Sequence, residues 1–163
     1  MDAITMKNGA GGFEPESEDI ILLDLLSWSE AFSCGIKIID DQHKELVNLI
    51  NEMFHHVSKD ENEEREYFEK SMHQTVKYTE AHFKTEEKLM SLAKVPGYKE
   101  HKNAHETFEE NIACYIRNFE ENKSPLLLEF ANSLKEWFLS HTAVKDKEYF
   151  DCFKKSFANQ LHK

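Results

Sequence analysis

Apolar residues recur at intervals of three and four along most of this chain, and no stretch keeps the alternation of a strand. This spacing places one apolar stripe along each of four helices. We predict the helices at about residues 40–58, 64–90, 99–119 and 125–146. Short polar or Pro-Gly segments separate them. Four long helices with short connections predict an all-α, up-down-up-down four-helix bundle.

Candidate capping residues indicate where two of the helices begin. Asp40 is a candidate N-cap for the first helix. Ser124 is a candidate N-cap for the fourth, with Pro125 at the first helical position. A shorter amphipathic stretch follows at about residues 147–161 and predicts a short C-terminal helix.

Residues 1–27 differ from the remainder in composition. Their first part is rich in glycine and poor in apolar residues, which predicts a flexible N-terminal extension. Residues 20–26 are apolar apart from Asp24 and read as a short segment that docks on the domain or binds a partner. Residues 28–163 then form one domain.

Charge and cysteine usage limit the function. A net charge of −11 argues against nucleic acid and anionic membrane surfaces as partners. No apolar run approaches the length that a membrane span requires. The three cysteines are odd in number and lack a CxxC spacing, so we expect reduced thiols and a cytoplasmic location.

Five of the nine histidines fall on the inward stripes, together with one glutamate, and an aspartate lies near the end of the fourth helix. They are His43, His82, His101, His105 and His141, with Glu86 and Asp146. A lone histidine on an apolar stripe is more often a hydrogen-bonded core residue than a ligand. Five buried imidazoles and two carboxylates need a shared partner, because each would be costly without one. A pair of metal cations satisfies all seven groups together.

The spacing of His141 and Asp146 is five residues rather than four. On a regular helix this leaves the two side chains about 140° apart. A local π-type turn would bring them together, and we predict such a distortion here. The alternative is that Asp146 is a surface acid beyond the helix end.

Several motifs together resemble the hemerythrin family in its bacterial form. They are Trp28; Gly35-Ile36 before the run Asp40 to Leu46; the run His82 to Glu87; Pro96-Gly97-Tyr98 before His101 and His105; and Trp137 before His141 and Asp146. The resemblance covers about residues 28–155. It implies that residues 28–163 are a hemerythrin-like domain with a non-haem di-iron centre that takes up dioxygen reversibly.

The resemblance also distributes the ligands. Three histidines would hold one iron, two would hold the other, and two carboxylates would bridge them beside an oxo or hydroxo group. In that order they are His101, His105 and His141; His43 and His82; Glu86 and Asp146. The second iron then has five ligands, and its open position is where dioxygen should bind.

Two positions depart from the family pattern. Phe138, beside Trp137, stands where leucine is usual, and Thr142 stands where isoleucine is usual. Trp137 and Phe138 would line the oxygen pocket. The larger Phe138 either fills the core in an ordinary way or alters oxygen access.

Three functions follow from these expectations. The first is an oxygen-binding protein, not an enzyme, that carries, stores or delivers dioxygen. Having only two carboxylates among seven ligands favours reversible binding over oxygen activation. The alternatives are an oxygen or redox sensor that acts through a separate protein partner, met by residues 1–27, and a di-iron enzyme that handles peroxide or nitric oxide.

Overall fold

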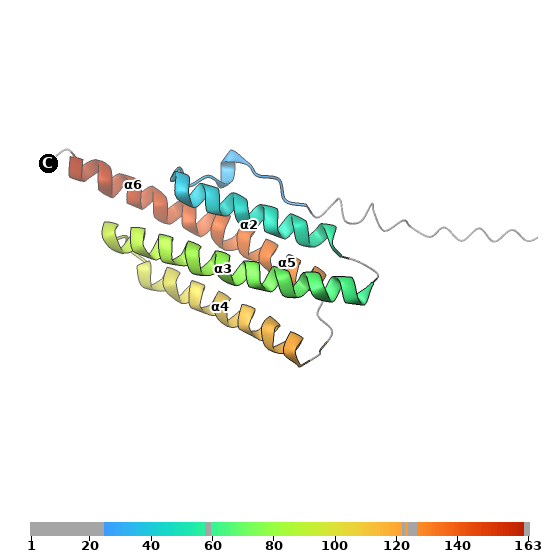
Figure 1. Ribbon diagram of the computed structural model, residues 1–163. Coiled ribbons are helices and arrows are strands. Elements are labelled where there is room, and N and C mark those ends of the chain that lie inside the picture. Colours follow the sequence, from blue (N-terminus) through green and yellow to red (C-terminus); the bar gives the residue numbers. More distant parts are fainter. Residues whose placement is uncertain (1–24, 58–59, 122, 124–126, 162–163) are drawn as a thin grey trace, which may run out of the picture.

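The computed structural model describes residues 25–57, 60–121, 123 and 127–161, with side chains up to residue 155. Within these ranges the chain is all-α, and its long helices lie side by side as a bundle (Figure 1). This confirms the predicted fold class. The elements are η1 (Glu30–Phe32), α2 (Lys37–His55), α3 (Glu61–Ala93), α4 (Tyr98–Glu120), α5 (Leu127–Trp137), η2 (Phe138–Asp146) and α6 (Lys147–Leu161).

The fourth helix of the bundle is composite. A π-helical segment, η2, follows α5 directly, and α6 continues from it without a break. The three elements form one long rod in Figure 1. The predicted C-terminal helix is therefore present over the expected residues, as a continuation of the fourth helix.

The prediction that Asp40 caps the first helix is wrong. The helix begins at Lys37 after Ile36, so Asp40 lies within its first turn, and the helix ends at His55 rather than near residue 58. The Asp40 carboxylate instead accepts hydrogen bonds from Ser33 Oγ, Cys34 N and Gly35 N. It therefore orders the loop that leads into the helix.

The second helix is longer at both ends than predicted. Its N-cap is Asp60, whose carboxylate accepts from the backbone N–H groups of Asn62 and Glu63. It continues past Met90 to Ala93 and ends at Lys94, which adopts a left-handed conformation with φ 52°. A lysine gave no sign of such a helix end, because glycine or asparagine is usual there.

Several predictions concern residues outside the described ranges. These include the capping roles of Ser124 and Pro125 and the flexible character of residues 1–24. Leu25 and Leu26, at the start of the described chain, pack against the main core. The backbone of Leu26 also donates to Asn51 Oδ1 at 2.8 Å and accepts from Asn51 Nδ2 at 2.7 Å.

Apolar clusters flank a buried polar layer along the bundle. On α2, Ile39 belongs to one cluster, His43 follows one turn later, and Leu46 belongs to the main core. On α3, Glu86 lies between Phe83 of the main core and Met90 of a third cluster. None of the helices in the described part of the chain is long and apolar enough to cross a membrane.

Candidate metal centre

The structure brings all seven sequence-predicted ligands into one buried layer. Each has a relative exposure of 3% or less. They come from α2 (His43), α3 (His82 and Glu86), α4 (His101 and His105) and η2 (His141 and Asp146). All four helical segments of the bundle therefore contribute.

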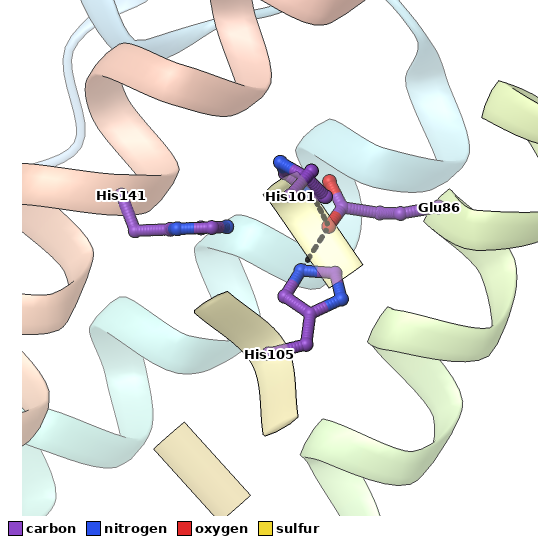
Figure 2. A group of neighbouring side chains, drawn as sticks. All are labelled: Glu86, His101, His105 and His141. Atoms are coloured by element: carbon purple, nitrogen blue, oxygen red, sulfur yellow. Dashed lines mark hydrogen bonds and ion pairs between the residues drawn. The ribbon is translucent and has the colours of Figure 1, made fainter. Parts of the chain in front are cut away.

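Their ligand atoms form two groups, and within each group all lie within 4.8 Å of one another. The first contains Glu86, His101, His105 and His141, and the second contains His43, His82, Glu86 and Asp146. Figure 2 shows the first group, with imidazoles from α4 and η2 converging on the Glu86 carboxylate. Glu86 belongs to both groups.

The Glu86 carboxylate faces three imidazoles through one oxygen. Its Oε2 lies 3.3 Å from His105 Nε2, 3.4 Å from His101 Nε2 and 3.5 Å from His82 Nε2. Ligand atoms at right angles around a metal ion, each bonded at about 2.1 Å, are about 3.0 Å apart. The observed spacing is close to that of neighbouring ligands on one ion.

The Asp146 carboxylate divides its two oxygens between the groups. Oδ1 lies 3.2 Å from His141 Nε2 and 3.5 Å from His101 Nε2, whereas Oδ2 lies 3.4 Å from His43 Nε2. A carboxylate that presents one oxygen to each of two groups has the arrangement of a bridging ligand.

The π-helix η2 is what makes this orientation available. An i to i+5 helix places residues five apart near one another, and His141 and Asp146 are both buried as a result. The predicted distortion is confirmed, and the alternative that Asp146 is a surface acid is wrong.

Many polar atoms of this layer lack a hydrogen-bond partner, as the atoms that bind a metal ion do when the ion is absent. Among the described residues, the buried atoms without a hydrogen-bond partner include several from this layer. They are both nitrogens of His43, Nε2 of His82, His105 and His141, Nδ1 of His101, Oε1 of Glu86 and both oxygens of Asp146. Each such atom costs about 1–3 kcal/mol if left unpaired. Imidazole and carboxylate donors together suit iron and other divalent first-row ions, so the residues fit the expected metals.

The pKa values of three candidate ligands, His82, His141 and Glu86, also suit metal binding. Burial lowers the pKa of His82 to about 4, so its imidazole is neutral at pH 7. Burial also lowers the pKa of His141. For Glu86 burial acts in the opposite direction, but His82, His101 and His105 outweigh it and hold the pKa well below its usual range. Neutral imidazoles and ionised carboxylates are the forms that bind metal. In His105, by contrast, burial opposes the charged form, but the Glu86 and Glu87 carboxylates raise the pKa.

Aromatic rings enclose the imidazoles. Phe83 stacks on His105 with centroids 3.7 Å apart, and Trp137 stacks on His141 at 4.0 Å. Trp137 also packs on Phe108 at 4.2 Å. These contacts place aromatic surface against His105 and His141.

The two residues expected at the oxygen pocket lie in different surroundings. Trp137 directly covers a histidine of the layer, as above. Phe138 is fully buried in the main core, and its ring meets Phe32 of η1 edge-on at 5.2 Å. The structure therefore places Trp137 beside the candidate centre and ties Phe138 to the N-terminal lead-in.

Sequence reasoning named Gln42 and Glu87 only as parts of motifs, without a role. Each hydrogen-bonds the outer nitrogen of a candidate ligand: Gln42 bonds His82, and Glu87 bonds His105. Each of them lies next to a candidate ligand in the sequence, and this position is the signal that could have indicated a role. Adjacency alone could not show which imidazole they would meet.

A four-helix bundle with a buried layer of histidines and carboxylates defines a class of helical domain that encloses a cation site. The family model of the hemerythrin HHE cation binding domain matches residues 34–153. The chain therefore belongs to the hemerythrin family.

Relatives agree with this assignment. A bacteriohemerythrin of Stenotrophomonas maltophilia is 31% identical over 127 residues, which span 78% of this chain and 80% of that protein. A myohemerythrin of Sipunculus nudus is 25% identical and covers 75% of this chain and 88% of its own length. A crystal structure of wild-type hemerythrin superposes with a TM-score of 0.70 at 23% identity, over 79% of this chain and 98% of that one, and supports the fold.

Proposed function

We propose that this chain binds dioxygen reversibly at a non-haem di-iron centre and acts as an oxygen carrier, store or delivery protein rather than as an enzyme. The observation that carries the proposal is the orientation of Asp146. One oxygen faces the group around His141, and the other faces His43 of the second group. A chain built for one metal ion would not need this arrangement.

The seven residues divide unequally between the two metal positions. His101, His105 and His141 would hold one iron, whereas only His43 and His82 would hold the other. Glu86 and Asp146 would bridge them, with an oxo or hydroxo group. An iron pair held by these residues would supply the redox chemistry of dioxygen uptake and release. The position with fewer imidazoles would leave room for the gas.

The protein's own residues provide a dry, fixed site. Burial keeps the imidazoles of His82 and His141 neutral, so their lone pairs are available. Phe83 and Trp137 cover imidazole faces and exclude water from that side. Excluding water and its protons favours release of intact dioxygen over its reduction.

Further parts of the proposal rest on the sequence. We propose that residues 28–163 form the domain and that Trp137 and Phe138 border the oxygen pocket. Residues 1–27 offer a means of contact with a protein partner. The unpaired Cys34, Cys114 and Cys152 agree with a reducing, cytoplasmic setting.

The test is an optical spectrum of iron-loaded, anaerobically reduced protein before air, in air, and after degassing. We expect a visible band that appears in air and disappears on degassing over repeated cycles. Direct passage to a stable oxidised spectrum would overturn reversible binding and favour the sensor function. Sustained turnover of peroxide or nitric oxide would favour the enzyme function.

A further inference from the structure

Two of the five histidines have a hydrogen-bond partner on the imidazole nitrogen that faces away from the buried layer, one in each group of ligands. The Nδ1 of His82 lies 3.1 Å from Gln42 Oε1, and the Nδ1 of His105 lies 3.2 Å from Glu87 Oε1. The first partner is a neutral amide and the second is a carboxylate. The two metal positions therefore differ in more than their number of histidines.

The hydrogen bonds around Gln42 fix its orientation. The Thr85 hydroxyl donates to the backbone oxygen of Ala81 at 2.7 Å, so it can only accept from Gln42. Gln42 Nε2 approaches that hydroxyl at 3.5 Å, which leaves Gln42 Oε1 to face His82. His82 must then carry its proton on Nδ1, and its Nε2 lone pair points into the buried layer.

Glu87 holds His105 in the same tautomer with a stronger acceptor. Its Oε2 accepts from Lys102 Nζ at 3.0 Å, while its Oε1 accepts from His105 Nδ1 at 3.2 Å. Glu87 is 20% exposed and lines an open groove of about 510 Å³ between α3 and α4. An ionised carboxylate at the outer nitrogen makes an imidazole more electron-rich than a neutral amide does.

We propose that Glu87 and Gln42 are positioning residues that make the two metal positions unequal. Glu87 strengthens the position held by His105, which binds a divalent ion first and more tightly. Gln42 fixes the tautomer of His82 without adding charge, so the two-histidine position is the weaker one. The weaker and less electron-rich metal position is then the one where dioxygen should bind. The inference rests on the proposed two-metal centre.

The experiment is a stepwise titration of metal-free full-length protein with Co²⁺, followed by its visible absorption. In wild-type protein we expect two resolved steps, with two ions bound at the end. Glu87→Gln keeps the shape and a carbonyl acceptor but removes the charge. It should raise the dissociation constant of the tighter step about tenfold and leave the weaker step within twofold. The matched control is Glu106→Gln, which removes a charge from the same groove. Within the described part of the chain, no hydrogen bond or ion pair joins Glu106 to a candidate ligand.

The reciprocal variant is Gln42→Glu, which gives His82 a carboxylate partner of the same size. It should lower the dissociation constant of the weaker step about tenfold. Gln74→Glu is its control, because Gln74 and Gln42 both line a groove between α2 and α3. The double variant Glu87→Gln with Gln42→Glu should bring the two dissociation constants together or reverse their order. Substitutions at residues with only a structural role would not exchange the affinities of the two metal positions.

A second readout is the reduction potential of iron-loaded protein. Removing the carboxylate in Glu87→Gln should raise the potential of the iron held by His105, because the more electron-rich ligand stabilises the oxidised ion. Equal effects of Glu87→Gln and Glu106→Gln, equal weakening of both steps, or two identical steps in wild-type protein would overturn the inference. Binding of no Co²⁺, or of only one ion, by wild-type protein would instead overturn the proposed two-metal centre.

Discussion

Asp40 is a buried carboxylate in the first turn of α2. Here Ile39 and Asp40 are already helical, and the carboxylate accepts three hydrogen bonds from the preceding loop. Burial opposes ionisation of this carboxyl, but the hydrogen bonds from Ser33, Cys34 and Gly35 hold its pKa below the usual value.

Asp40→Asn should lower the free energy of unfolding by about 1–2 kcal/mol at pH 7, because the amide cannot accept all three hydrogen bonds. A lowered folded-state pKa means that the contribution is complete above the unfolded pKa of about 3.9 and is lost as pH falls through the folded value. Urea denaturation at pH 7 and near pH 3 should show the difference from wild type shrinking in acid. Asp41→Asn is the control: Asp41 is exposed and pairs with Lys37 on the surface, so its loss should cost about 0.5 kcal/mol or less. A pH-independent difference for Asp40→Asn would contradict this account.

Gly97 is the other residue whose local requirement is clear. Its φ is +83°, and an added Cβ would lie 2.9 Å from Cε1 and Oη of Tyr149. The Tyr149 ring in turn meets His101 edge-on at 4.7 Å. Gly97→Ala therefore combines backbone strain with a collision that displaces a neighbour of a candidate ligand.

We expect Gly97→Ala to lower the melting temperature more than Gly35→Ala does. Gly35 has a similar φ of +75°, but its added Cβ would meet only the flexible end of Lys154, at 3.0 Å. Both changes should cost about 1–2 kcal/mol from the left-handed conformation, and Gly97→Ala should cost more. Equal losses for the two variants, measured by thermal denaturation, would show that the contact with Tyr149 is unimportant.

At the scale of residues, the seven candidate ligands could be singled out in the sequence because their chemistry is distinctive, and the structure brings them into one buried layer. Buried imidazoles and carboxylates at helical spacing have few explanations other than a shared cation. Gln42 and Glu87 were not given a role, because a glutamine or glutamate on a helix is usually a solvated residue. Only the packing of α2 and α4 against α3 shows which imidazole each of them meets.

At the scale of elements, the helix count and the π-helix were predictable, whereas several helix ends were not. The five-residue spacing of His141 and Asp146 required a distortion once both were expected to face inward. The sequence did not indicate the helix start at Lys37. The residue before it, Ile36, has an apolar side chain, which makes no capping hydrogen bond. The end of α3 was hidden because Lys94 occupies a position that glycine usually takes.

Lys94→Gly should stabilise the protein. Lys94 is left-handed, and the backbone N–H of Val95 closes the helix end on the Met90 carbonyl at 3.1 Å. Glycine removes the steric cost of this conformation, for a net gain of about 0.5–1 kcal/mol in the free energy of unfolding. Lys94→Ala keeps the Cβ and should change little. Urea denaturation of both variants measures the difference, and equal stabilities would argue against strain at this helix end.

At the scale of the whole molecule, the buried layer makes stability depend on metal. Without ions, the bundle keeps ionisable groups such as His43 and Asp146 in its interior with unpaired atoms. A ligand that binds only the folded state stabilises it by about 2.7 kcal/mol when its concentration is one hundred times its dissociation constant. Two such sites would contribute about 5 kcal/mol.

Removing metal with a chelator should therefore lower the melting temperature by about 10–20 °C, and returning Fe²⁺ under anaerobic conditions should restore it. Scanning calorimetry of metal-free and reloaded protein measures this directly. His43→Ala should show a smaller gain on reloading, because one position loses a ligand. A melting temperature that does not respond to metal would argue that the layer is not a binding site.

We propose that the centre takes up dioxygen and returns it unchanged. The most direct measurement is a gas-exchange assay on reduced, iron-loaded protein, in which dioxygen taken up and then released is counted against iron content. We expect one dioxygen bound for every two irons, recovered in full when the pressure is lowered, with the iron again ferrous. Uptake without recovery, accompanied by ferric iron and peroxide or water, would contradict it.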